Sequence, residues 1–121
     1  TAELGHFDFA RRKITGALSG DALAQALLGR FGGLAQGALF PVPGLRLVVA
    51  RVERSDGVKI VFSNGWWLGL RASGTEPAAR IYAETWAPPG ADAATVAQLG
   101  PAREAIQDYA ARELALVLRA G

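Results

Sequence analysis

The sequence predicts an α+β fold in which an antiparallel sheet packs against helices on one of its faces. Helical apolar periodicity occurs in the segments on either side of residues 45–85. Between them, alternating apolar runs are separated by short turn signals, of which Asn64-Gly65 is the strongest. Consecutive strands joined by tight turns are antiparallel, so we expect the flanking helices to cover one face of the sheet.

The N-terminal segment predicts one strand and one helix. Phe7 and Phe9 share one face of an alternating run, which is typical of a strand. Ser19 or Asp21 can cap the helix, because their side-chain oxygens accept hydrogen bonds from the amides of a first helical turn. Gly32-Gly33 ends the helix. The predicted elements here are a strand over 5–14, a helix from 21 to about 30 and a proline-containing loop over 37–44.

The central segment predicts four consecutive strands. Ser55-Asp56-Gly57 separates the first two, because glycine tolerates positive φ and aspartate bonds to its own turn. Asn64-Gly65 separates the second and third, and residues 72–78 form a loop before the fourth. The predicted strands are 45–54, 58–62, 66–71 and 79–85.

The C-terminal segment predicts two helices after Pro88-Pro89-Gly90 ends the sheet. The first helix covers residues 92–99, and Gly100 interrupts it. Pro101 suits the first turn of the second helix, where its missing N–H would have no intrahelical partner. One face of that helix is apolar and carries Ile106, Tyr109, Ala110, Leu114, Val117 and Leu118.

The composition predicts a single globular domain and excludes several classes of function. The chain has 121 residues, of which 50% are hydrophobic and 20% charged. Its net charge of +2 is too small to indicate nucleic acid or a membrane as a partner, and no apolar run reaches the roughly 20 residues that span a bilayer. The lack of cysteine excludes disulfides and thiolate chemistry, and fits a cytoplasmic location. Since the chain starts at Thr1 and contains no Met, we expect it to be a piece of a longer protein.

Residues 71–77 have the composition of a phosphate-binding loop between two strands. Arg71 ends a strand, so its planar guanidinium is positioned by rigid backbone and can bind two phosphate oxygens at once. Ser73 and Thr75 add hydroxyl donors. Gly74 lets the backbone turn and lets main-chain N–H groups approach an anion. This arrangement predicts a site for a phosphate dianion.

The residues alone leave two questions open: whether this loop binds phosphate or is an ordinary turn, and whether Arg80 belongs to the site. By composition, a Ser-Gly-Thr loop between strands is more often an ordinary turn. Pro77 restricts Glu76 to an extended conformation, which stiffens the loop before a ligand arrives. Arg80 either adds charge to the anion site or pairs with Glu76 or Glu84.

Other candidate residues favour structural roles. His6 is the only histidine, and nothing near it suggests a triad or a metal cluster. The basic run 11–13 is typical of a solvated strand end. Large aromatics in alternating strands usually belong to a core or an interface, which is our interpretation of Trp66, Trp67 and Trp86.

Four motifs taken together resemble the last domain of the α-D-phosphohexomutase superfamily, which includes phosphoglucomutases and phosphomannomutases. The family pattern is DGxK(I/V), a GW strand, RxSGTEP and (R/K)(I/V)Y(A/V)E. The resemblance covers about residues 54–86 and implies a TATA-binding-protein-like α+β fold. The matching segments are 56–60 (DGVKI), 65–68 (GWWL), 71–77 (RASGTEP) and 80–84 (RIYAE).

The resemblance implies that this domain holds whichever phosphate of a phosphohexose is not being transferred. It implies no catalytic residue and no metal ligand in this chain. Glu76 and Pro77 are expected to organise the loop. The residues implied to bind the phosphate are Arg71, Ser73, Gly74 and Thr75, with Arg80 as a weaker candidate.

The family's catalytic parts do not occur in this sequence. A T-A-S-H-N-P-like serine loop, an Asp-Gly-Asp-Gly-Asp metal loop and a sugar-selecting Gly-Glu-x-Ser-Gly segment are all missing. We therefore expect no mutase activity from the chain alone and no cofactor within it, with Mg²⁺ bound elsewhere in the parent enzyme. The expected partners are a phosphohexose and the parent's other domains, and not nucleic acid or a membrane. The alternative is a stand-alone phosphosugar-binding module without catalysis, which would lack a serine loop and a metal loop upstream.

Overall fold

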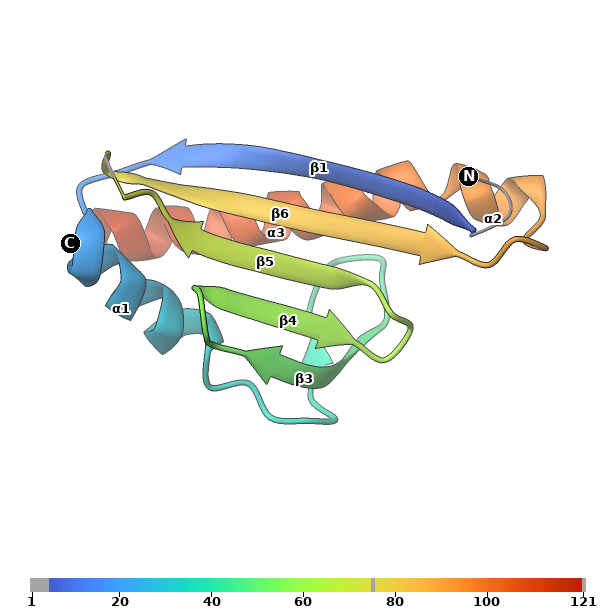
Figure 1. The fold of residues 1–121 in the computed structure, drawn as a ribbon, viewed down its shortest axis with the longest axis horizontal. Helices are drawn as coiled ribbons and strands as arrows, with labels where there is room; N and C mark the ends of the chain where they lie inside the picture. The colour runs from blue at the N-terminus through green and yellow to red at the C-terminus, as the bar shows by residue number, and fades with distance from the viewer. Residues whose placement is uncertain (1–4, 75, 121) are drawn as a thin grey trace.

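The structure, a computed structural model, consists of a six-stranded sheet with helices on one side. It describes residues 5–74 and 76–120, with side chains described as far as residue 116. The strand order is β1-β6-β5-β4-β3-β2 and every neighbouring pair is antiparallel (Figure 1). The elements are β1 (His6–Thr15), α1 (Gly20–Phe31), β2 (Leu39–Phe40), β3 (Leu47–Glu53), β4 (Val58–Phe62), β5 (Trp67–Ala72), β6 (Ala78–Ala87), α2 (Ala93–Ala97) and α3 (Leu99–Ala120).

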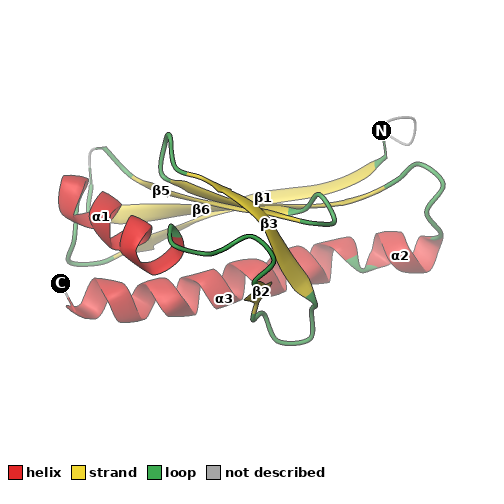
Figure 2. Cartoon of the chain, turned by 90° about the horizontal axis from the view of Figure 1, so that it is seen from below, coloured by secondary structure: helices red, strands yellow, loops and turns green. Residues whose placement is uncertain are grey.

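Helices α1 and α3 cover the same face of the sheet, as Figure 2 shows. Alternate side chains of the strands point into this layer, and the apolar stripes of the two helices complete the core. The predicted fold class is therefore confirmed. The core includes Leu23, Leu27 and Phe31 of α1, Ile106, Ala110 and Leu114 of α3, and Ile60, Leu68, Leu70 and Ile81 of the sheet.

The opposite face of the sheet, which we call the open face, carries the other half of each alternating strand. Its side chains are half-buried or exposed along β1 and β6. On the three strands that matter for the site, the open-face residues are Phe7, Phe9, Arg11 and Lys13 of β1, Arg80, Tyr82, Glu84 and Trp86 of β6, and Trp67, Gly69 and Arg71 of β5.

The first strand pairs with the last one, at the edge of the sheet. The register runs from His6 opposite Ala87 to Thr15 opposite Ala78. The end of β1 therefore lies beside the start of β6, where the loop from β5 arrives. The remaining strands follow one another as a meander.

A buried amide fastens α3 across the β1–β6 pair. Gln107 is fully buried, and its Nε2 donates to the carbonyl oxygens of Ala10 (2.9 Å) and Ile81 (3.2 Å). Its Oε1 accepts from Arg103 Nη1 at 2.7 Å, and Arg103 also pairs with Asp8. Each polar group of this amide is thus satisfied, as burial requires.

The helices are linked and capped by a few polar contacts. Arg30 of α1 pairs with Glu113 of α3, and this hydrogen bond raises the pKa of Arg30. Asp92 caps α2 by accepting from the backbone N of Thr95 at 2.8 Å, which lowers the pKa of the Asp92 carboxyl. Ser19 occupies the predicted cap position of α1 but makes no side-chain cap hydrogen bond.

Most predicted elements differ from the structure by one or two residues at their ends, and three differences have a clear physical reason. The predicted loop over 37–44 contains β2, because Phe40 is buried against Phe62 and Tyr109 and its strand pairs with β3. Strand β6 continues to Ala87 because β1 pairs along its whole length. Helix α3 starts at Leu99, before Gly100 and Pro101, since its first turn tolerates a proline. Val117 and Leu118, which were predicted on the apolar face of the last helix, lie outside the described side chains.

No helix among the described residues is long and apolar enough to cross a membrane.

Candidate functional site

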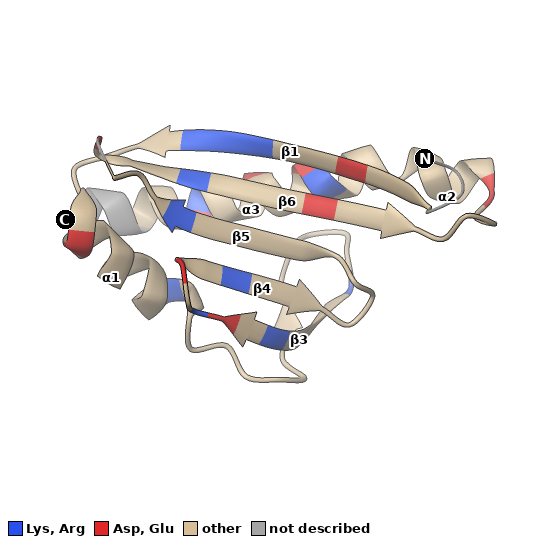
Figure 3. Ribbon diagram, viewed as in Figure 1, with Lys and Arg blue, Asp and Glu red and all other residues tan. Residues whose placement is uncertain are grey.

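Three basic side chains form a row across the open face, beside the loop that joins β5 to β6. Arg80 lies directly opposite Lys13 of β1 on one side and Arg71 of β5 on the other. Figure 3 shows the corresponding blue segments next to one another on the three strands. Like charges directly opposite in a sheet repel each other. Lys13 and Arg71 each have a carboxylate partner, Glu76 and Asp56, so the positive potential of the row is concentrated at Arg80.

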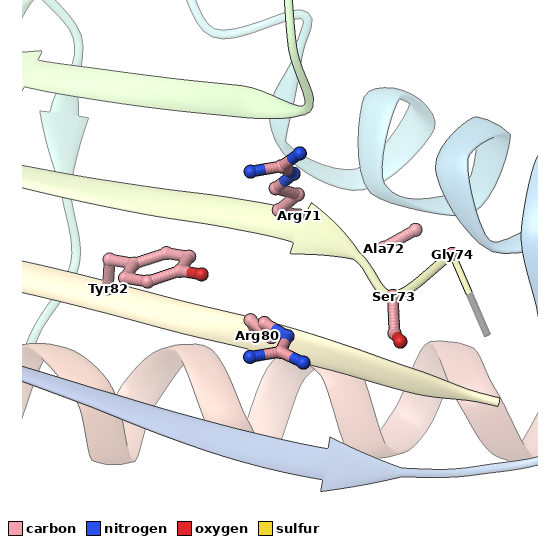
Figure 4. A pocket seen from close by; sticks show the side chains of 6 residues that line it. All are labelled: Arg71, Ala72, Ser73, Gly74, Arg80 and Tyr82. Atoms are coloured by element: carbon pink, nitrogen blue, oxygen red, sulfur yellow. The ribbon is translucent and has the colours of Figure 1, made fainter. Parts of the chain in front are cut away.

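A cavity of about 260 Å³ opens at this row. In Figure 4, Arg71 and Arg80 rise from neighbouring strands, Ser73 lies past the end of β5, and the Tyr82 hydroxyl points toward the loop. The cavity thus has guanidinium, hydroxyl and glycine backbone groups on its walls, all of which suit an anion. The lining residues are Arg71, Ala72, Ser73, Gly74, Arg80 and Tyr82.

Arg71 makes one ion pair, with Asp56 of the turn between β3 and β4. The distance between Arg71 Nε and Asp56 Oδ1 is 3.5 Å, and the side chains are 57% and 69% exposed. An exposed pair of this kind contributes only about 0–1 kcal/mol. A doubly charged phosphate can therefore compete with Asp56 for the guanidinium.

Arg80 does not pair with either carboxylate that the sequence offered as an alternative. Glu76 accepts from Lys13 Nζ, at 3.2 Å and 3.3 Å to its two oxygens. Glu84 accepts from Trp67 Nε1 at 3.2 Å. Within the described part of the chain, Arg80 thus keeps its charge uncompensated beside the cavity.

The loop is tied back to both neighbouring strands. The Ser73 amide donates to the Ala78 carbonyl at 2.8 Å, and Ser73 is only 6% exposed. The Gly16 amide, at the end of β1, donates to the Pro77 carbonyl at 2.9 Å. Together with the Lys13–Glu76 ion pair, these contacts make β1 part of the loop's support. Thr75 lies outside the described residues.

Two side chains near the loop escaped the sequence analysis. Tyr82 lines the cavity, and its spacing of two from Arg80 was the available signal, since it places both on one strand face. The basic run lies near the end of β1, as expected, and its Arg11 and Lys13 are exposed, but two of its members also make ion pairs. Lys13 pairs with Glu76, and Arg12 pairs with Asp108 of α3 at 2.5 Å on the other face.

The remaining candidates lie away from the cavity. His6 is partly exposed at the start of β1. Trp66 packs against the core, whereas Trp67 and Trp86 lie half-buried on the open face. Among the described residues, no three His, Cys, Asp or Glu side chains group into a metal site.

Comparison with known proteins identifies the family. The model of the phosphoglucomutase/phosphomannomutase C-terminal domain matches residues 22–99, which include the cavity. A phosphoglucomutase/phosphomannomutase of Thermococcus kodakarensis is 53% identical over 34 residues, which are 28% of this chain and 7% of that protein. The chain therefore matches only a small part of this relative's length. The antiparallel sheet with helices on one face also fits the TATA-binding-protein-like fold that the resemblance implied. The chain belongs to the family of phosphoglucomutase/phosphomannomutase C-terminal domains.

Proposed function

We propose that this chain is the phosphate-binding domain of a phosphoglucomutase or phosphomannomutase. It holds the phosphate of a phosphohexose that is not being transferred, while the parent's other domains, with Mg²⁺, move the second phosphate. The observation that supports this proposal is the pair Arg71 and Arg80, directly opposite each other on neighbouring strands and both lining a polar cavity.

The proposed roles follow from the chemistry of each group. Arg71 binds two phosphate oxygens through its guanidinium, and Arg80 adds the second positive charge. Ser73 and Thr75 provide hydroxyl donors, and the backbone at Gly74 approaches the anion closely. Glu76 and Pro77 organise the loop without touching the phosphate.

This domain contributes positioning and no reacting group. Phosphoryl transfer depends largely on holding the donor and acceptor oxygens in line. Binding the phosphate that does not react holds the sugar in place, so part of the free energy of phosphate binding offsets the entropy lost when the reacting oxygens are aligned. The reaction would be the reversible movement of phosphate between two hydroxyls of a hexose, which places the parent among the isomerases of carbohydrate metabolism.

The proposal is tested by amide NMR of the 121-residue chain titrated with glucose 6-phosphate. We expect weak binding, with a Kd on the order of 1 mM, because one face of a site supplies few contacts. Shifts should centre on residues 71–80 and should weaken at least about tenfold in Arg71→Ala, since a charged bidentate contact is lost.

The matched control is Arg51→Ala. Arg51 is an exposed arginine of β3 that pairs with Glu53 at 2.8 Å, away from the cavity. Its loss should leave the Kd unchanged. Shifts spread evenly over the surface, or equal weakening in the two variants, would contradict a specific phosphate site.

A further inference from the structure

The open face continues from the phosphate cavity into an aromatic surface, which begins at Tyr82. The Phe9 ring of β1 stacks on the Tyr82 ring, with centroids 6.3 Å apart and planes 19° from parallel. Phe9 also contacts Trp67 of β5, with centroids 6.0 Å apart. Phe9 remains 52% exposed. An aromatic pair, exposed at Phe9 and half-buried at Tyr82, therefore borders the cavity.

Tyr82 is half-buried, and its neighbour on β1 is Arg11. Its partner on β5 is Gly69, which has no side chain to cover the ring. A Cβ at Gly69 would come within 3.1 Å of the Trp67 ring and 3.7 Å of the Tyr82 Cβ, so the Trp67 ring lies close over this glycine and would have to shift slightly to admit a side chain. The Tyr82 hydroxyl points toward the loop and bonds to no described residue (Figure 4).

The cavity has room for more than a phosphate group. Its volume of about 260 Å³ approaches the roughly 300 Å³ at which small-molecule sites begin. A phosphate placed between Arg71 and Arg80 leaves the space beside Tyr82 for whatever the phosphate is attached to. That neighbouring group would lie beside Tyr82, the one aromatic residue of a mostly polar lining, and within reach of its phenolic hydroxyl.

Building on the proposed function, we propose that Tyr82, supported by Phe9, is a subsite for the sugar ring of the phosphorylated substrate. The electron-rich face of an aromatic ring attracts the weakly positive C–H bonds of a sugar, and the contact removes apolar surface of both partners from water. The Tyr82 hydroxyl can exchange a hydrogen bond with a sugar hydroxyl. The subsite makes this domain select a cyclic phosphosugar over phosphate alone.

The test compares three ligands on the same chain by amide NMR titration: inorganic phosphate, glycerol phosphate and glucose 6-phosphate. We expect glucose 6-phosphate to bind about three- to tenfold more tightly than the two ligands without a ring, which is the range of a single aromatic contact. Tyr82→Leu should abolish this preference, measured as the ratio of the Kd values for inorganic phosphate and glucose 6-phosphate in the same variant, because it removes the ring and keeps most of the apolar volume.

Phe7→Leu is the matched control. Phe7 is on the same face of β1 and 51% exposed, but it contacts Trp86 and not Tyr82. The variant should keep the preference for glucose 6-phosphate. Phe9→Leu removes the support of the Tyr82 ring and should reduce the preference partly. It also provides the test if Tyr82→Leu does not fold.

The outcomes separate the two proposals. If the chain binds no phosphate at residues 71–80, the proposed function fails and the subsite fails with it. If inorganic phosphate binds there but glucose 6-phosphate binds no better, the phosphate site stands and the sugar subsite is overturned. An unchanged preference in both Tyr82→Leu and Phe9→Leu, or an equal loss in Phe7→Leu, would also overturn it.

Discussion

The two ends of the open face differ in how their side chains are satisfied. At the loop end, Lys13, Arg80 and Arg71 lie in a row of like charges across three strands. At the far end, aromatic rings meet one another: Phe7 contacts Trp86 with centroids 6.4 Å apart. Cross-strand aromatic pairs stabilise a sheet, whereas opposed like charges destabilise it. The aromatic contacts of the far end thus stabilise the fold, whereas the opposed charges of the loop end do not, and the proposed phosphate site accounts for that difference.

The largest expected effect is a loss of stability on substituting a turn glycine, and it should be greater at the loop end than at the far end. Gly57, beside the loop end, has φ of +78°, and a Cβ there would overlap the Leu70 carbonyl oxygen of β5. Gly57→Ala should lower the free energy of unfolding by about 2–5 kcal/mol, from backbone strain and a clash with a rigid strand. Urea unfolding followed by circular dichroism measures this loss.

Gly65, at the far end, is the control for Gly57. Its φ is +89°, but a Cβ there would meet nothing closer than 3.9 Å. Gly65→Ala should therefore cost only the backbone term of about 1–2 kcal/mol. Equal losses in the two variants would show that the packing of the turn against β5 is unimportant.

The next effect separates binding from stability at the loop end. Arg80→Ala should weaken phosphate binding about tenfold, because a charged contact is lost. It should leave the free energy of unfolding unchanged or raise it by about 0.2–1 kcal/mol, because a like-charge neighbour of Lys13 and Arg71 disappears. A clear loss of stability in urea would contradict the idea that this row is destabilising.

At the far end we expect a substitution to lower stability without changing phosphate binding. Phe7→Leu should lower the free energy of unfolding by about 0.5–1.5 kcal/mol, since its aromatic contact with Trp86 is lost. The Kd for inorganic phosphate should stay the same in NMR titrations. A changed Kd would mean that the two ends are coupled, and the comparison would need revision.

The smallest effect concerns the support of the loop by β1. Lys13→Ala removes the ion pair with Glu76, whose partners are half-exposed, so the free energy of unfolding should change by at most about 1 kcal/mol. Hydrogen exchange at the Ser73 amide should accelerate, because the loop opens more often. Unchanged exchange would show that the backbone bond from Gly16 to Pro77 is sufficient support.

Much of the fold was predictable because its signals are local. Strand β4 was predicted with its observed bounds, since alternation and the flanking turn glycines are properties of neighbouring residues. The loop was placed between the right strands for the same reason. Arg71, Ser73 and Gly74, whose residue types suit phosphate, line one cavity.

The tertiary structure decided which distant segments meet at that loop. Nothing local to β1 shows that Lys13 lies opposite Arg80, or that Phe9 stacks on Tyr82, because register between strands far apart in sequence is set by the packing of the whole core. The short strand β2 also depends on tertiary packing, because burial of Phe40 in the core brings this segment into pairing with β3. By itself the sequence determined the class of fold and the chemistry of the loop, because both depend on near neighbours. The charge row and the aromatic wall required the folded sheet, because only cross-strand pairing brings their members together.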